Sequence, residues 1–168
     1  MLRKVIKFTL VICCMLIIFM FSSDSGTASS KKSDSVIINL VEVISNKKVN
    51  NKDRDKYIEK YVFPVRKCAH FTIYLILGIL VISLLSEYRI LNFKTVLYTL
   101  LIVFLYACSD EFHQLFVPGR AGRIGDVGVD SIGVLVALLL MVGVRVCISS
   151  LWKKDKSVGI ESSSQEKM

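Results

Sequence analysis

The sequence predicts an all-α integral membrane protein, a bundle of four transmembrane helices. Of its 168 residues 53% are hydrophobic, more than the roughly 45–50% that is usual for a soluble domain. These residues lie in a few long runs and not in short alternating pieces, which is typical of segments that span a bilayer. The net charge of +8 comes from 22 Lys and Arg against 14 Asp and Glu. Because the charges flank the apolar runs, anionic lipid headgroups are their expected partner.

The four predicted spans are residues 5–22, 67–86, 95–112 and 130–149. The first also has the features of a cleaved signal peptide, because Lys7 is followed by an apolar stretch and then by a serine-rich stretch. Local features therefore leave open whether this first helix is retained.

The segment between the first two spans, residues 23–65, is predicted to be an extracytoplasmic loop. Its serine-rich first part, residues 22–35, is expected to be extended or flexible. Residues 36–44 repeat apolar side chains at helical spacing, which predicts a short amphipathic helix on the membrane surface. Pro64 is expected to start the next helix, where its missing N–H costs nothing.

The remaining spans are bounded by clear breaks. A short polar turn precedes the third span, and Pro118-Gly119 ends it. The fourth span carries small residues that are expected to allow close helix packing, namely Gly128, Gly133, Ala137 and Gly143. Residues 1–152 are thus predicted to form one membrane domain, followed by a polar, disordered tail at 153–168.

Orientation follows from the lysines and arginines near the ends of the spans. Those before the first span and after the last favour both termini in the cytoplasm, although the 23–65 loop is also rich in basic residues. The first helix usually dominates. A multi-pass protein of the cell membrane with its N and C termini inside is therefore expected.

Topology brings a polar cluster to one membrane face, because the second span starts, the third ends and the fourth starts there. Arg66, His70 and Tyr74 form one stripe of a helix, and Asp126 and Asp130 lie near a helix N terminus, which stabilises carboxylates. Both histidines are expected to lie in this cluster. Its members are Arg66, Lys67, His70, Tyr74, Asp110, Glu111, His113, Gln114, Arg120, Arg123, Asp126 and Asp130.

Three interpretations of this cluster remain open. The charged groups could pair to hold helix ends together. They could bind an anionic or polar ligand such as a lipid headgroup, through Arg66, Lys67, Arg120 and Arg123. The carboxylates and histidines could also hold a divalent metal or perform acid–base chemistry.

No common catalytic or cofactor motif is present in the sequence. HExxH, GxSxG, the P-loop and GxGxxG are all missing, so the sequence predicts no metal and no cofactor, and it identifies no catalytic residue. It has no nucleic-acid-binding motif either. The five cysteines are expected to be apolar packing residues and not disulfides. Oligomeric state is left open.

Two motifs resemble the signature of the VanZ-like family: residues 66–74, which read RKCAHFTIY, and residues 109–120, which read SDEFHQLFVPGR. The resemblance extends over about residues 10–145 and favours a retained first helix. The chain departs from the usual family pattern at Ile73, where many members carry an acidic residue, and at Asp24, where glutamine is common.

The resemblance implies a small polytopic membrane protein, and the family's namesake is associated with low-level resistance to teicoplanin but is not needed for vancomycin resistance. Teicoplanin carries a fatty acyl tail and vancomycin does not. We therefore expect a cell-envelope protein that binds or alters an amphiphile at the outer membrane face. The alternatives are a membrane-embedded enzyme acting on a lipid-linked substrate and a scaffold for cell-wall enzymes. The recognition residues would be Arg66, His70, Asp110, Gln114, Arg120 and Asp126.

Overall fold

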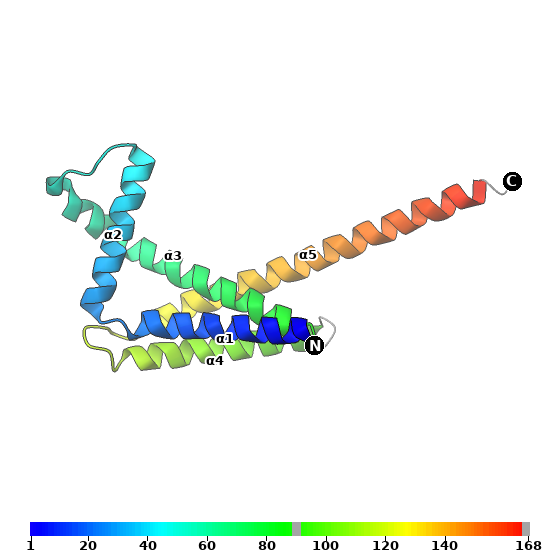
Figure 1. The fold of residues 1–168 in the computed structure, drawn as a ribbon, viewed down its shortest axis with the longest axis horizontal. Helices are drawn as coiled ribbons and strands as arrows, with labels where there is room; N and C mark the ends of the chain where they lie inside the picture. The colour runs from blue at the N-terminus through cyan, green and yellow to red at the C-terminus, as the bar shows by residue number, and fades with distance from the viewer. Residues whose placement is uncertain (89–91, 166–168) are drawn as a thin grey trace.

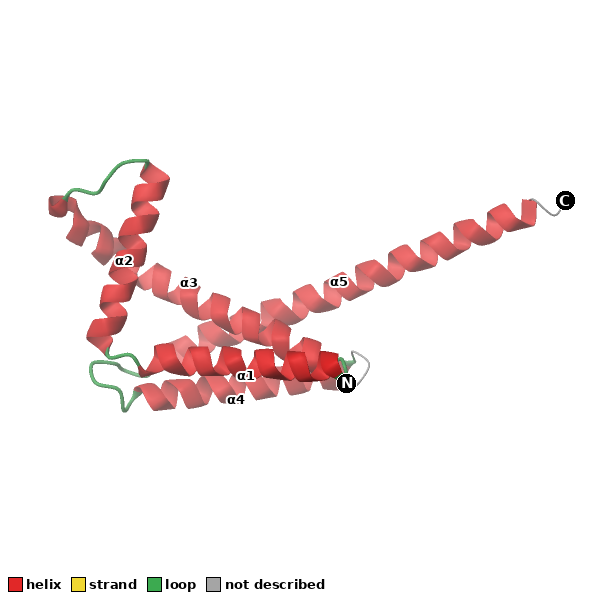
Figure 2. Ribbon diagram, viewed as in Figure 1, coloured by secondary structure: helices red, strands yellow, loops and turns green. Residues whose placement is uncertain are grey.

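The computed structural model describes residues 1–88 and 92–165, with side chains through residue 150. The described chain is helical throughout its regular structure and contains no strand (Figure 2). The predicted all-α membrane bundle is confirmed, because four of the helices are long and apolar enough to cross a membrane. The five helices are α1 (Leu2–Ser23), α2 (Gly26–Ser45), α3 (Asn51–Leu85), α4 (Phe93–Gln114) and α5 (Ile124–Gln165).

The bundle is formed by α1, α3, α4 and α5, with α3 in contact with each of the other three (Figure 1). The most extensive helix contact joins α3 and α5. The N terminus and the α3–α4 turn lie at one end of the bundle, whereas the α1–α2 and α4–α5 connections lie at the other. The helix ends that the sequence assigned to one membrane face are thus at one end of the bundle.

Each helix buries one narrow stripe and exposes apolar side chains elsewhere. Ile18 of α1, Leu77 of α3 and Val103 of α4 are among the buried core residues. Phe8 and Leu139 point outward, and the second of these is 73% exposed. Apolar surface on this scale is unfavourable in water and expected in lipid. The α1 helix, with 22 residues, is about 33 Å long at 1.5 Å per residue, enough for the hydrocarbon core.

The segment predicted as a loop is mostly helical, which corrects the sequence-based prediction. Ser25 caps α2 by accepting a hydrogen bond from the Ala28 N–H at 3.3 Å, so the serine-rich stretch is helical and not extended. Asn46 ends α2 in the left-handed conformation, with φ of 51°. The predicted amphipathic helix at 36–44 is the second half of α2.

Pro64 lies inside α3 and does not start it, contrary to the prediction. The residues before it include three lysines, Arg54 and Glu59, which are good helix formers and extend the helix back to Asn51. The first part of α3 and all of α2 therefore form a helical pair that extends beyond the bundle (Figure 1).

The small residues of α5 are used unequally. A Cβ on Gly133 would lie 2.5 Å from the Phe71 carbonyl oxygen of α3, and Ala137 is fully buried. Close packing is therefore confirmed at these two positions. A methyl group added at Gly128 or Gly143 would meet nothing within 4 Å, so for them the prediction was wrong.

Each predicted span falls on one helix, namely α1, α3, α4 or α5, but the helices extend beyond the predicted bounds, most of all α3, which begins at Asn51, and α5. The apolar part of α5 ends at Ser150, but its backbone remains helical through Gln165, where the sequence predicted a disordered tail. The division into a membrane domain and a tail stays a prediction. All five cysteines are free.

Candidate functional site

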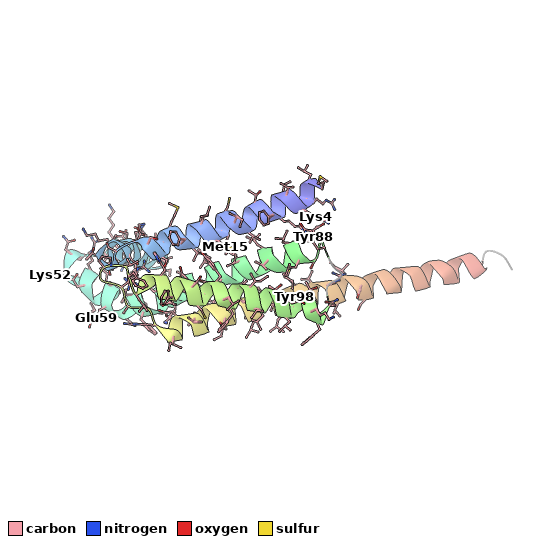
Figure 3. All side chains as sticks on the ribbon, turned by 90° about the horizontal axis from the view of Figure 1, so that it is seen from below. Lys4, Met15, Lys52, Glu59, Tyr88 and Tyr98 are labelled. Carbon is pink, nitrogen blue, oxygen red and sulfur yellow. The ribbon has the colours of Figure 1, made fainter. Side chains whose placement is uncertain are left out.

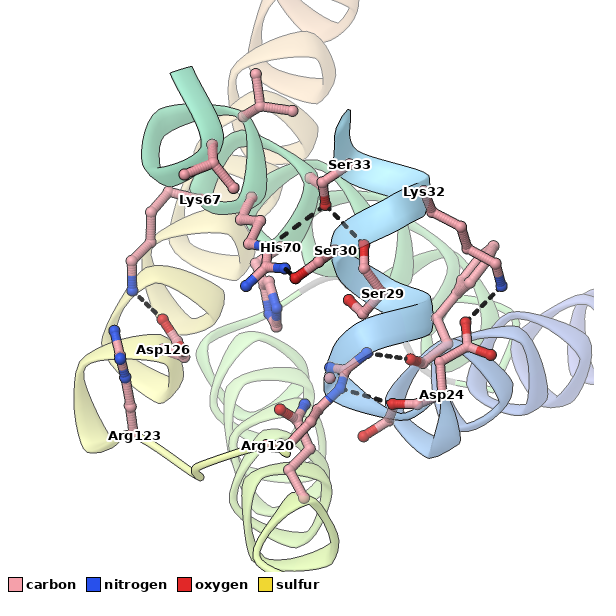
Figure 4. A pocket seen from close by; sticks show the side chains of 18 of the residues that line it. Asp24, Ser29, Ser30, Lys32, Ser33, Lys67, His70, Arg120, Arg123 and Asp126 are labelled. Carbon is pink, nitrogen blue, oxygen red and sulfur yellow. Dashed lines mark hydrogen bonds and ion pairs between the residues drawn. The ribbon is translucent and has the colours of Figure 1, made fainter. Parts of the chain in front are cut away.

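A cavity of about 800 Å³ opens at the end of the bundle where α1 meets α2 (Figure 4). Side chains from all five helices and from the α4–α5 loop line it. Its apolar wall comes largely from α1, α2 and the start of α3, with Ile18, Phe21, Val36, Val62, Phe63 and Val65. Its charged and ionisable lining residues are Asp24, Lys32, Arg66, Lys67, His70, Tyr74, Asp110, Arg120, Arg123 and Asp126.

Arg66 reaches from α3 to α2 across the cavity. Its guanidinium donates to Ser30 Oγ at 2.8 Å and to Ser33 Oγ at 3.4 Å. These acceptors are neutral, and among the described side chains no carboxylate lies within ion-pair distance of Arg66. Its positive charge is therefore held in the cavity without a negative partner.

Arg120 is a second cavity arginine without a carboxylate partner among the described residues. Its guanidinium donates to the backbone carbonyl oxygens of Phe21 at 2.7 Å and Asp24 at 2.9 Å, at the C-terminal end of α1. Burial, and after it the positive charge of Arg66, lowers the pKa of Arg120 from its usual value. The two guanidinium groups are therefore close enough for their charges to oppose each other.

The lysines that line the cavity, unlike these two arginines, have carboxylate partners. Lys67 pairs with Asp126 across the α3–α5 contact, and Lys32 pairs with Asp24 at 2.5 Å (Figure 4). These ion pairs connect neighbouring elements and support the structural interpretation for this part of the cluster. Arg123 lines the cavity with them.

Deeper in the bundle lies an inner cluster, which we define as His70, Tyr74, Asp110, Glu111 and Asp130. His70 Nδ1 lies 3.2 Å from Asp130 Oδ1, and the Asp130 side chain is fully buried. Asp110, 5% exposed, accepts a hydrogen bond from Gln114 Nε2 at 3.3 Å. His70, Tyr74, Asp110 and Gln114 face the cavity.

Several polar atoms of the inner cluster have no hydrogen-bond partner among the described residues. They are Asp110 Oδ1, Glu111 Oε1, Asp130 Oδ2 and the Tyr74 hydroxyl, all inaccessible to solvent. Glu111 Oε2 does accept a hydrogen bond from the Arg123 backbone N–H at 2.7 Å. Buried polar groups are rarely left unpaired, and those that are often mark a functional position.

His113 is the predicted cluster residue that the structure places elsewhere. Its Nε2 lies 3.2 Å from Ser23 Oγ, and its ring packs on Phe19 with centroids 4.7 Å apart. It therefore contacts α1 and does not line the cavity. Both histidines lie at the same end of the bundle, but only His70 lines the cavity.

Ser30 and Ser33, which hold Arg66, were not among the residues predicted from the sequence. Their spacing of three residues places them on one face of a helix, but the serine-rich stretch was expected to be extended. Ile73 and Asp24, where the chain departs from the usual family pattern, both line the cavity.

The fold and the site define a multi-pass membrane protein with a charged cavity at one end of its helical bundle. The chain matches the VanZ/LLP1 family model over residues 7–147, and it belongs to that family. No curated protein and no solved structure matches it.

Proposed function

We propose that this protein binds an amphiphile with an anionic headgroup in the cavity at the end of the bundle. The observation that carries the proposal is the pair Arg66 and Arg120, two guanidinium groups in one cavity that donate only to neutral oxygens. Guanidinium groups bind phosphate and carboxylate in a bidentate manner. An anion between them would also relieve their mutual repulsion.

The cavity wall is suited to the apolar part of such a ligand. Phe63 and Val36, on the α2–α3 pair, line the cavity and are 62% and 47% exposed. A ligand that places its headgroup on the arginines can lay its chain along these side chains. Apolar contact and a few polar groups are the usual composition of a small-molecule site.

In the cell envelope, this activity would give low-level teicoplanin resistance. With both termini in the cytoplasm, the cavity faces the outer leaflet. The protein would there bind or alter a lipid, or hold the acylated drug, and vancomycin without an acyl tail would be unaffected.

Binding is tested with purified protein in detergent and native mass spectrometry. The probes are phosphatidylglycerol, which is anionic, and phosphatidylcholine, which is zwitterionic. We expect phosphatidylglycerol to be retained preferentially and Arg66→Gln to weaken its binding about tenfold, the loss of about 1.4 kcal/mol that one charged contact represents.

Arg54→Gln is the matched control, because Arg54 is exposed on the same helix and does not line the cavity. Arg66 is preferred to Arg120 for substitution, since Arg120 also holds the end of α1. Equal retention of both lipids, or equal losses in Arg54→Gln and Arg66→Gln, would contradict the binding proposal.

The resistance role is tested by teicoplanin and vancomycin susceptibility in a sensitive Gram-positive host, with membrane levels matched by immunoblot. We expect the wild type and Arg54→Gln to raise tolerance to teicoplanin alone, and Arg66→Gln to lose the effect. If no variant changes susceptibility while lipid binding holds, the protein binds an amphiphile without a resistance role.

A second candidate function is an enzyme that acts on a lipid-linked substrate. The His70–Asp130 pair favours it, because a histidine oriented by a buried carboxylate is a common general base, and Asp110 lies beside it facing the same cavity. Loss of the resistance phenotype in Asp110→Asn with lipid binding intact would favour chemistry. Tolerance of that change would favour binding or a scaffold for cell-wall enzymes.

A further inference from the structure

Three metal-ligating side chains meet inside the bundle, one from each of three helices. A ring nitrogen of His70 on α3, a Glu111 carboxylate oxygen of α4 and an Asp130 carboxylate oxygen of α5 all lie within 4.8 Å of one another. Glu111 and Asp130 both lie 40 or more residues after His70 in the chain, although they are closer to each other. A local sequence motif could not reveal such a set.

The separation of the His70 and Asp130 ligand atoms suits two ligands of a single ion. Metal–nitrogen and metal–oxygen bonds of about 2.1 Å in tetrahedral geometry place neighbouring ligand atoms about 3.4 Å apart. The observed separation of His70 Nδ1 and Asp130 Oδ1 is 3.2 Å. The donor set of one imidazole and two carboxylates suits ions such as Mn²⁺ and Zn²⁺.

The unpartnered atoms provide an independent indication of a ligand. Asp130 is fully buried and Glu111 is 6% exposed, yet Asp130 Oδ2 and Glu111 Oε1 have no hydrogen-bond partner in the described structure. Tyr74 is also fully buried with an unpartnered hydroxyl, and it lines the cavity together with His70 and Asp110. These groups surround one small polar region.

The excess of carboxyl groups over basic groups in the inner cluster also favours binding of a cation. Asp110, Glu111 and Asp130 are three carboxyl groups at membrane depth, and His70 is the one ionisable base bonded to any of their side chains in the described structure. Lys67, three residues before His70 on α3, is paired with Asp126. Uncompensated buried carboxylates are strongly unfavourable.

We propose that His70, Glu111 and Asp130 bind one divalent transition-metal ion. His70 ligates through Nδ1, which requires a neutral ring with its proton on Nε2. Three protein ligands leave coordination positions open, as in sites where the metal also binds water or a ligand. His70 lines the cavity, so the ion enters from there. This site does not depend on the cavity's binding an amphiphile.

The test uses the full chain, purified in detergent and stripped with a chelator. Mn²⁺ is the probe, since it prefers oxygen and nitrogen ligands over the free cysteines of this chain. Free Mn²⁺ is measured by electron paramagnetic resonance in a titration. We expect about one equivalent bound per chain and a higher thermal unfolding midpoint with the ion present.

Asp130→Asn should lower Mn²⁺ affinity by at least about tenfold, as loss of a direct ligand does, and should abolish the thermal shift. Asp53→Asn is the control, because Asp53 is an exposed carboxylate near the start of α3 that does not line the cavity. If Asp130→Asn is not recovered folded, Glu111→Gln replaces it, because an amide oxygen can still accept from the Arg123 N–H. No stoichiometric binding by the wild type, or equal losses in the control, would overturn the proposal.

Discussion

The two ends of the bundle differ in how completely their charged groups are paired. At the end with the α3–α4 turn, Lys7 donates to Glu87 at 2.5 Å and to the Ser83 carbonyl oxygen at 3.2 Å. Lys4 of the same end lies over the Tyr88 ring at 4.3 Å, and Figure 3 shows both residues far from Lys52 and Glu59 at the other end. Polar groups here are partly exposed and partnered.

At the cavity end the arginines lack carboxylate partners, and the inner cluster contains buried oxygens without hydrogen bonds among the described residues. A protein selected only for stability would pair such groups or replace them with apolar ones. Ionisable residues kept at membrane depth generally serve function. The contrast therefore supports the ligand site that we propose at the cavity end.

The largest expected effect concerns the helix contact that holds the cavity end together. Gly133→Ala places a methyl group 2.5 Å from the Phe71 carbonyl oxygen, which is backbone and cannot yield cheaply. We expect a loss of about 1–3 kcal/mol in the free energy of unfolding, as for other overpacked sites. Thermal unfolding in detergent, followed by far-UV circular dichroism, measures it.

Gly143→Ala is the control on the same helix, because its added methyl group meets nothing within 4 Å. It should be neutral or stabilise by up to about 1 kcal/mol through helix propensity. Similar losses in both variants would mean that the close α3–α5 contact is not what positions His70 against Asp130.

A smaller effect on stability is expected from two neighbouring tyrosines, Tyr74 and Tyr106, whose ring centroids are 6.4 Å apart. The Tyr106 hydroxyl donates to the Met15 carbonyl oxygen at 2.6 Å, whereas the buried Tyr74 hydroxyl has no partner among the described residues. Tyr106→Phe should lower the free energy of unfolding by about 1 kcal/mol. Tyr74→Phe should leave the stability of the metal-free protein unchanged or raise it.

The same unfolding measurement compares the two variants under identical conditions without added metal. A larger loss for Tyr74→Phe than for Tyr106→Phe would show that the inner cluster is a satisfied structural network. It would remove the contrast between the two ends.

The sequence predicted the spans well because a bilayer imposes a local requirement, about 20 apolar residues in a row. It also predicted which helix ends meet, because alternating spans leave few topologies. It could not predict how each helix is rotated about its axis. Glu111 and His113 differ by about 200° around α4, so one faces the inner cluster and the other faces α1.

The serine-rich stretch shows a second limit. Ser30 and Ser33 are weak helix formers, and their role depends on Arg66, more than 30 residues away in the chain. Local propensity favours an extended or flexible segment, whereas packing of α2 on α3 makes it a helix. The contact of α2 with α3 therefore accounts both for the helical structure of α2 and for the cavity that α2 lines.

The smallest expected effect is a pH dependence at the turn end. The hydrogen bond from Lys7 lowers the pKa of the Glu87 carboxyl below its ordinary 4.5. Since the pKa is lower in the folded protein, the pair stabilises the fold above about pH 4.5 and loses this contribution as the pH falls through the lowered value. A double-mutant cycle with Lys7→Met and Glu87→Gln, measured by thermal unfolding, should show coupling at neutral pH that fades in acid and at high salt. Coupling that persists in acid would mean that packing, and not the ion pair, joins α1 to the turn.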